Sequence, residues 1–468
     1  PRMVHDGYDK PIYCTPPTQE LAGLMLQDSA HIQEIEAEWR SQRYARRDQH
    51  DPVVPLYTTE DALKVLPLFK NVKYHEMFEP HPGVQVRFYD AGHILGAAAV
   101  HVTVTENGLS TRLLFSGDHG RPGALIVQAP EAPPATDYLF VESTYGDRDH
   151  KQKANALEEL AEAIAYSHKH REKVIIPAFA VERTQEVLYC LHALSGRGKL
   201  PADMPVFVDS PLAIRATEIF RRHQAYFDPH ARLLLARGED PFDLPHLRYT
   251  LSAAESQAIN DVQGPAIIVS ASGMCNAGRI RHHLKHNLWK TGASIVFVGY
   301  QGEGTPGRKI VDGGKSISLF GDEVAIKAKV FTIGGFSGHA GQSELLDWIG
   351  AAVRPDVRIV LVHGEIKAQE PLADLIRKKF QLDPIIPDYL EELEIVPGKA
   401  LAQVLPAAPE AARPKVDWDF LTRDIEAKWT MLKAKLDEAD TRPWAEQTEL
   451  RERMLKLNFE LVRFLAKL

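Results

Sequence analysis

Four short segments place a histidine or an aspartate directly after a run of residues that reads as a β-strand. The segments are AGHILGAA, FSGDHG, FSGHAGQ and LVHGE, which carry His93, Asp118, His339 and His363. Each segment alone also fits a structural histidine or a common turn. Together, three imidazoles and a carboxylate flanked by glycine are a donor set that suits a borderline-soft divalent metal. The sequence therefore predicts a metal site.

The elements that must position these side chains have two different patterns. Before residue 145, short alternating runs predict strands, and a helical pattern covers residues 18 to 40. From about residue 150, helices alternate with continuous apolar runs such as VIIPAFA and AIIVS, which predicts a doubly wound parallel sheet. The strands KVFTIGG and RIVLVHG lead to the last two histidines. Such strand ends are the usual place for chemistry in α/β sheets. The early strands are expected at residues 84–89, 99–105, 113–116 and 138–142.

The composition excludes several classes of protein. The 468 residues are 44% hydrophobic and 25% charged, as in an ordinary folded chain. The net charge of −8 differs from that of a generally basic nucleic-acid coat, so any polyanion site must be local. Three cysteines without a Cys-x-x-Cys pair fit a reduced, cytoplasmic setting. We expect no membrane segment, because no apolar run approaches about 18 residues.

A change in composition near residue 405 predicts a domain boundary. The segment LPAAPEAARPK is a linker-like run of proline and alanine. Beyond it, apolar residues recur at helical spacing in two stretches separated by Pro443, which predicts a helical hairpin. The hairpin could pack against the body of the protein, or it could serve dimerisation or docking of a partner.

The order and wording of the motifs resemble the β-CASP nucleases of the metallo-β-lactamase superfamily, from about residue 1 to 400. The resemblance identifies His93 and Asp118 with the second His motif and the bridging Asp motif. It identifies Glu142 in VESTYGDR with motif A, His339 with motif B and His363 with motif C. RNA-processing members carry histidine in motif C, so His363 favours RNA as the substrate.

The resemblance implies a four-layer αββα metallo-β-lactamase domain interrupted by a doubly wound α/β β-CASP domain and followed by the helical hairpin. The expected boundaries are 1–146 and 331–402 for the two parts of the metal domain, 147–330 for the β-CASP domain, 403–415 for the linker and 416–468 for the hairpin.

The resemblance also implies two zinc ions. In that arrangement Asp118 bridges both ions, and His93 and His363 each bind a different one. Glu142 and His339 would form a carboxylate and imidazole pair that protonates the leaving oxygen. A simple turn carboxylate is the alternative for Glu142. Either Glu142 or Glu365 could orient a ligand histidine.

Substrate contacts are expected from the inserted domain. Arg183 follows a buried strand in PAFAVERTQE, where a guanidinium and helix-end amides could hold a phosphate. The segment SASGMCNAGRIRHHLKHNLWK adds Ser272, Gly273, Arg279 and Lys285, and GYQGEGTPGR adds Arg308. The alternatives are a surface ion pair for Arg183 and a solvated helix face for the basic segment.

One family motif is missing from the sequence, because no H-x-H-x-D-H occurs in it and the chain starts at Pro1. We expect this loop a few residues upstream of Pro1, in which case the chain as given binds zinc poorly and does not cleave. Otherwise the protein is an inactive scaffold or an RNA-binding homologue. The expected function is zinc-dependent hydrolysis of single-stranded RNA. Endonuclease or 5′ exonuclease action and a homodimer are left open. A small-molecule hydrolase is the further alternative, disfavoured by the inserted basic segment.

Overall fold

The computed structural model describes residues 1–45, 53–149, 153–388, 391–396, 403–405 and 418–436, with scattered positions between 447 and 461. The chain forms two compact units. The first comprises Pro1–Asp388 and Leu393–Leu405, and the second comprises Tyr389–Glu392 and Pro406–Leu468. All the elements that position the predicted metal site belong to the first unit.

A six-stranded mixed sheet forms the metal-site half of this unit, in the order β16-β7-β6-β5-β4-β3. Strands β3 to β6 form an antiparallel meander, and β7 and β16 add to it in parallel. The four strands predicted for the first 145 residues are confirmed as β4 to β7. The bounds are β3 (Met77–His81), β4 (Val84–Asp90), β5 (Ala98–Glu106), β6 (Leu109–Phe115), β7 (Tyr138–Glu142) and β16 (Arg358–Val362).

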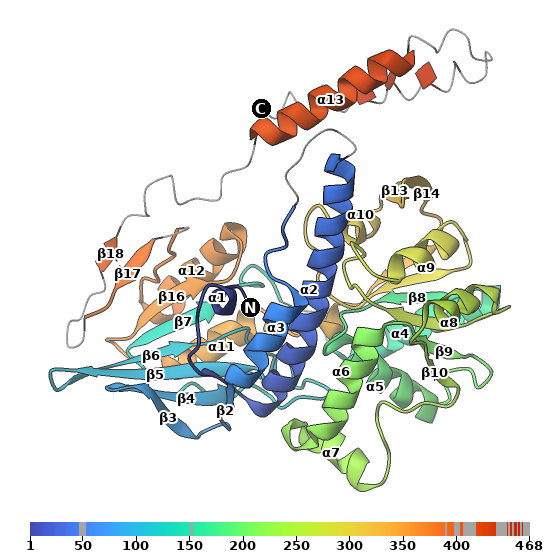
Figure 1. Cartoon of the computed structure of the whole chain (residues 1–468). Coiled ribbons are helices and arrows are strands. Elements are labelled where there is room, and N and C mark those ends of the chain that lie inside the picture. The colour runs from blue at the N-terminus through green and yellow to red at the C-terminus, as the bar shows by residue number, and fades with distance from the viewer. Residues whose placement is uncertain are drawn as a thin grey trace. The chain divides into compact units, whose positions relative to one another are not determined.

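Alternating side chains give this sheet two apolar faces. Leu114 and Leu139 pack with residues of α11 (Gln342–Ala352) and α12 (Ile366–Phe380) on one face. On the other face, Val86 and Phe88 pack against Tyr13, which belongs to a short parallel pair of strands, β1 and β2. Helix α2 lies against β2 and α3. The order of helices, small sheet, large sheet and helices is the predicted αββα arrangement (Figure 1). The bounds are α1 (Arg2–His5), β1 (Ile12–Cys14), α2 (Pro16–Ala45), α3 (Thr59–Val65) and β2 (Phe69–Asn71).

The inserted half contains a second six-stranded sheet, in the order β10-β9-β11-β8-β12-β15, with every pair parallel. Val174 and Ile176 pack on the face that α4, α5 and α6 cover, and Ile175 faces α9 and α10. Both faces are therefore buried, which confirms the doubly wound prediction. The strands are β8 (Val174–Pro177), β9 (Val206–Val208), β10 (Leu247–Tyr249), β11 (Ile267–Ser270), β12 (Ser294–Phe297) and β15 (Lys329–Thr332). The helices are α4 (Lys153–His170), α5 (Arg183–Gly196), α6 (Pro211–Arg222), α7 (Pro229–Ala236), α8 (Ala253–Ala258), α9 (Ile280–Asn287) and α10 (Pro306–Val311).

The boundaries drawn from the sequence differ in detail from the elements. The boundary at residue 330 falls inside β15, which pairs with β12, so the chain leaves the inserted sheet after Thr332. The residues of an edge strand have the same pattern as those of its neighbours. Nothing in KVFT therefore indicates where the inserted domain ends. A short hairpin, β13 (Ser316–Leu319) and β14 (Asp322–Ala325), precedes it.

The C-terminal region contains α13 (Trp418–Leu436), which corresponds to the first predicted helix of the hairpin. Most residues of the second predicted helix lie outside the described part of the chain, so the hairpin stays a prediction. The strands β17 (Glu392–Glu394) and β18 (Gln403–Leu405) complete the elements, and β18 occupies the first residues of the predicted linker. Among the described residues, we find no helix with the length and apolar character needed to cross a membrane.

Candidate functional site

The topology brings the predicted ligands to one edge of the mixed sheet. Strands β6, β7 and β16 are parallel, and β4 runs in the same direction because two antiparallel pairings separate it from β6. Their carboxyl ends therefore meet. His93 follows β4, Asp118 follows β6, Glu142 ends β7 and His363 follows β16. His339 arrives from the loop after η4 (Gly334–Phe336), where the chain returns from the inserted sheet.

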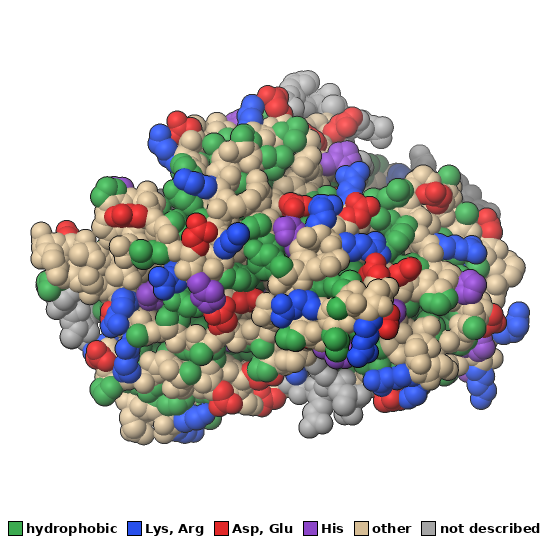
Figure 2. All heavy atoms as spheres, turned by 90° about the horizontal axis from the view of Figure 1, so that it is seen from below, with side chains coloured by type: hydrophobic (Ala, Val, Ile, Leu, Met, Phe, Trp, Pro, Cys, Tyr) green, Lys and Arg blue, Asp and Glu red, His purple; other side chains and the backbone are tan. Residues whose placement is uncertain are grey.

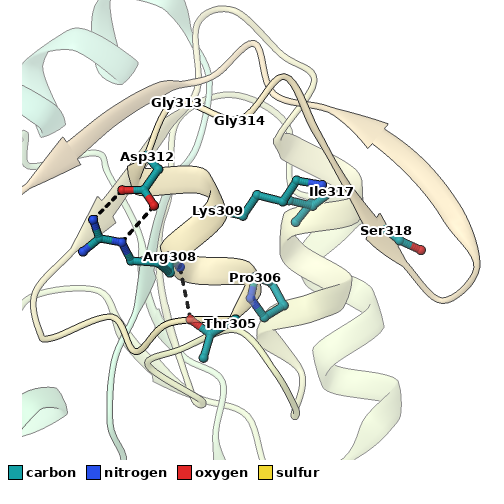
Figure 3. Close-up of a pocket in the computed structure, with 10 residues that line it drawn as sticks. Thr305, Pro306, Arg308, Lys309, Asp312, Gly313, Gly314, Ile317 and Ser318 are labelled. Atoms are coloured by element: carbon teal, nitrogen blue, oxygen red, sulfur yellow. Dashed lines mark hydrogen bonds and ion pairs between the residues drawn. The ribbon is translucent and has the colours of Figure 1, made fainter. Parts of the chain in front are cut away.

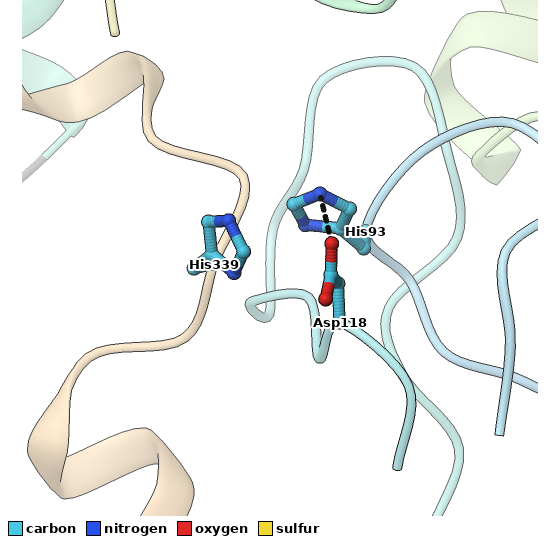
Figure 4. A group of neighbouring side chains, drawn as sticks. All are labelled: His93, Asp118 and His339. Carbon is cyan, nitrogen blue, oxygen red and sulfur yellow. Dashed lines mark ion pairs between the residues drawn. The ribbon is translucent and has the colours of Figure 1, made fainter. Parts of the chain in front are cut away.

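Three of these side chains form a compact cluster that could hold a metal ion. One ligand atom from each of His93, Asp118 and His339 lies within 4.8 Å of the others (Figure 4). His93 Nε2 is 3.8 Å from Asp118 Oδ2, and His363 Nε2 is 3.3 Å from Asp118 Oδ1. The two oxygens of Asp118 thus face two different imidazoles, an arrangement that suits a bridging carboxylate.

The predicted carboxylate and imidazole pair is present. His339 Nδ1 lies 2.9 Å from Glu142 Oε1, and Glu142 is fully buried. The same carboxylate accepts the backbone N–H groups of His119 at 2.7 Å and Thr144 at 3.1 Å. Burial alone would raise the pKa of Glu142, but the hydrogen bonds from His339, Thr144 and His119 hold that pKa below its ordinary value. The ionised carboxylate therefore fixes the His339 ring, whose centroid is 4.3 Å from that of His93.

From the family motifs we expected His339 to transfer a proton and not to be a metal ligand. The structure places it in both groups, because the ring bonded to Glu142 also belongs to the cluster with His93 and Asp118. Glu365, the other candidate for orienting a histidine, pairs instead with Lys367 at 2.5 Å. Glu142 is therefore the predicted carboxylate that contacts a histidine of the site.

His93 is held in its neutral form. Burial, together with the nearby charges of His339 and Arg183, lowers the pKa of His93 to about 3. A neutral imidazole is the form that binds a metal ion.

The loop that carries His93 also lies against the loop of Asp118, since a Cβ at Gly120 would be 1.8 Å from the carbonyl oxygen of Gly92. A side chain at residue 120 cannot fit this approach.

The residues predicted to contact substrate are all engaged within the protein. Arg183 is buried, pairs with Glu186 and donates to the carbonyl of Phe336. It lies beside the metal cluster, because a Cβ at Gly338 would touch both Arg183 and His93. Arg183 does form an ion pair, but the pair is buried and not at the surface. The sequence could not show this, because η4, which covers the start of α5, is far away in the chain.

The basic segment is engaged in a similar way. Arg279 donates to Asp209 at 2.7 Å and to two backbone carbonyls. Lys285 pairs with Asp322 at 2.6 Å. Arg308 donates from Nε and Nη2 to the two carboxylate oxygens of Asp312 (Figure 3). The further predicted contacts are Ser272, which donates to Asn276 at 2.7 Å, and Gly273, which lies against Phe179. Each of these side chains therefore already has a partner within the protein. RNA binding by this segment stays a prediction.

Other residues near the site were not found from the sequence. A pocket of about 340 Å³ joins the predicted residues His363 and Arg308 to Arg148, Tyr300 and Lys367, and Asp147, Glu303 and Glu365 line it as well. Arg148 and Tyr300 lie in the segments VESTYGDR and GYQGEGTPGR, but only the fold brings them beside His363.

His119 was also missed. It is buried against Trp348, with ring centroids 4.3 Å apart, and burial lowers its pKa to about 4. Its place directly after Asp118 in SGDHG was a signal that the sequence did offer.

The charged surface is mixed. On the face shown in Figure 2, basic and acidic side chains alternate, which agrees with the net charge of −8. Binding of a polyanion to that face would therefore depend on a few local groups.

Comparisons with known proteins agree with this geometry. Residues 184–310 match the Beta-Casp domain family, and residues 323–387 match the Zn-dependent metallo-hydrolase RNA specificity domain. The ribonuclease TTHA0252 of Thermus thermophilus is 34% identical over 381 residues, which cover 81% of this chain and 81% of that protein. The second domain description supports the use of a metal.

The transcription termination factor FttA of Thermococcus kodakarensis is 32% identical, over 83% of this chain and 58% of its own length. FttA of Pyrococcus abyssi is 33% identical with the same coverage. The chain thus spans less than two thirds of the FttA relatives. With the two domain matches, the shared motifs and the ribonuclease relative, the chain belongs to the β-CASP family of the metallo-β-lactamase superfamily.

Proposed function

We propose that this chain is the catalytic part of a zinc-dependent ribonuclease that hydrolyses phosphodiester bonds of single-stranded RNA. The observation that carries the proposal is the convergence of His93, Asp118, His339 and His363 beside the buried Glu142. The name of the ribonuclease relative and the RNA specificity domain support the same reaction.

The arrangement of the donors is compatible with two zinc ions, one on each side of Asp118. Asp118 presents its two oxygens toward His93 and His363, and imidazole nitrogens and carboxylate oxygens are ordinary zinc ligands. Zinc bound there would lower the pKa of water and stabilise negative charge on the phosphate. The role of the protein is to hold these ligands together at one sheet edge.

His339 would hold the proton for the leaving oxygen. Its Nδ1 is fixed by Glu142, and that carboxylate is fixed in turn by two backbone N–H groups. The carboxylate orients the imidazole, which is the most common general acid of proteins. The ring could therefore donate a proton when the bond to the leaving oxygen breaks.

One observation favours a second candidate, a non-catalytic RNA-binding homologue. The cluster offers three histidines and one aspartate, fewer donors than two four-coordinate zinc ions need. The same experiment separates the two functions, because a non-catalytic homologue would bind RNA without cleaving it.

The experiment compares Asp118→Ala, Glu142→Gln and the control Glu158→Gln in the protein that contains this chain. A labelled single-stranded RNA is incubated with each, and bound zinc is measured by mass spectrometry. Asp118→Ala should abolish cleavage and lower bound zinc. Glu142→Gln should keep the zinc and slow cleavage about 10²–10⁴-fold. Glu158 pairs with Lys199 at the surface, so Glu158→Gln should behave like the parent. RNA binding without cleavage by the parent would favour the non-catalytic candidate.

The cysteines support the proposal of a cytoplasmic setting. Cys14, Cys190 and Cys275 are all buried and none forms a disulfide, which supports a reducing, cytoplasmic compartment. A homodimer remains a proposal that light scattering can test.

A further inference from the structure

A partly exposed aromatic ring lies in a pocket that the metal-type histidines also line. Phe179 lies two residues after the end of β8 and is 37% exposed, which is unusual for a large apolar side chain so close to a buried strand. The pocket has a volume of about 330 Å³, and His93 and His339 form part of its wall. The ring is therefore open to a molecule bound at the metal cluster.

The backbone around Phe179 fixes the position of its ring. A Cβ at Gly273 would be 3.0 Å from Cδ2 of the ring, and one at Gly299 would be 3.5 Å from Cε2. These glycines follow the neighbouring strands β11 and β12, so two stretches of bare backbone hold the ring edge. The carbonyl of Phe179 accepts both the N–H and the hydroxyl of Thr184. The ring is thus held in place without being covered.

The chemistry of the pocket suits a flat apolar group. Ile94, Met274 and Phe336 line it together with Phe179, and its strongest cation, Arg183, is already paired with Glu186. A surface of this kind can stack with any base, since every base has a π-face and few polar groups are present to read its edge. A phosphodiester held at the cluster brings an attached base to the same pocket, because His93 and His339 are shared by both.

We propose that Phe179 is a stacking platform for the RNA base next to the cleaved phosphodiester. The inference rests on the proposed ribonuclease function. It also explains why Gly273, which we expected to bind substrate, is a glycine: its bare backbone packs against the Phe179 ring. The contact recognises the presence of a base and is tolerant of its identity.

The test is a coupling measurement on a short single-stranded RNA of defined sequence. Its cleavage site is mapped first, and derivatives are made with one abasic nucleotide on either side of that bond. Dissociation constants are measured by fluorescence anisotropy with the zinc-loaded protein and an RNA whose scissile bond is a non-hydrolysable analogue, so the readout does not depend on turnover. In the parent, one abasic position should weaken binding about tenfold.

Three variants test whether Phe179 is the group that stacks on the base. Phe179→Leu should weaken binding of the intact RNA about tenfold and lose the effect of the abasic position, because the two changes remove the same interaction. Phe179→Tyr keeps a ring and should retain most of the effect. Phe320→Leu, at an exposed phenylalanine outside this pocket, should leave the abasic effect unchanged. Bound zinc should be the same in all three variants.

Two outcomes would overturn the inference in distinguishable ways. If the protein binds and cleaves RNA but the abasic effect persists in Phe179→Leu, the stacking platform is wrong and the ribonuclease function stands. If the protein binds no RNA at all, both the inference and the proposed function fail. An apolar side chain of a protein partner would then be the better occupant of the pocket.

Discussion

Replacing Arg279 by alanine tests whether this residue serves the fold or the substrate. Its guanidinium lies 2.7 Å from Asp209, whose side chain is fully buried. Burial raises the pKa of Asp209, yet hydrogen bonds from His283, Ser256, Thr250 and Arg279 hold that pKa far below its ordinary value. Arg279→Ala removes one of these donors and leaves a buried carboxylate with reduced compensation.

The expected cost follows from the remaining partners. Removing one member of a buried ion pair costs about 3–5 kcal/mol. Three side-chain donors stay within 2.6 Å of Asp209, so the lower end, about 3 kcal/mol, applies. For a domain of about 200 residues this lowers Tm by roughly 6 to 12 °C.

The assay is thermal unfolding of Arg279→Ala beside the control Lys285→Ala. Lys285 forms an exposed pair with Asp322, worth about 0–1 kcal/mol, so its Tm should fall by no more than about 4 °C. RNA affinity is measured against salt for both variants at low temperature. If Arg279→Ala left Tm unchanged and lowered the salt slope by about 0.7, Arg279 would be a phosphate contact and the structural reasoning would be refuted.

Three further predictions concern the loops and thiols. Burial raises the pKa of Asp90 to about 7, so the folded state retains a proton that the unfolded chain loses near pH 4, and stability falls as pH rises to about 7. Asp90→Asn should therefore be more stable than the parent, and its advantage in the free energy of unfolding should grow by about 3 kcal/mol from pH 5 to pH 8; an equal difference at both pH values would contradict this. Gly120→Ala should lower both Tm and zinc affinity because its Cβ meets the Gly92 carbonyl, whereas Gly196→Ala, with no atom within 4 Å, should change neither. Burial raises the pKa of Cys275 to about 12, and Cys14 is also buried, so an aromatic disulfide reagent should label the folded protein slowly and the unfolded protein fast. Fast labelling of the folded protein would show that these thiols are accessible.

The convergence of the candidate ligands could be predicted from the sequence because the end of a strand can be recognised locally. His93, Asp118 and His363 each follow an apolar run, and parallel strands must bring such positions to one edge. The pairing of Glu142 with His339 also followed from the family motifs, although the residues are 197 positions apart.

Contacts across the fold could not be predicted in the same way. A charged residue after a strand looks the same in sequence whether it faces solvent or an internal partner. Arg183 was expected to hold a phosphate and is buried beside His93, and Arg279 was expected to bind RNA and holds Asp209. The sequence did not predict a role for Phe179, because the surroundings of its ring include glycines more than 90 positions away in the chain.

The central claim is metal-dependent hydrolysis of RNA at the Asp118 cluster. The most direct test removes bound zinc with a chelator and restores it stepwise while cleavage of a labelled single-stranded RNA is followed. Cleavage should stop in the zinc-free protein and return in proportion to the zinc bound, and Asp118→Ala should regain neither zinc nor activity. Equal cleavage by the zinc-free protein, or full recovery by Asp118→Ala, would contradict the account.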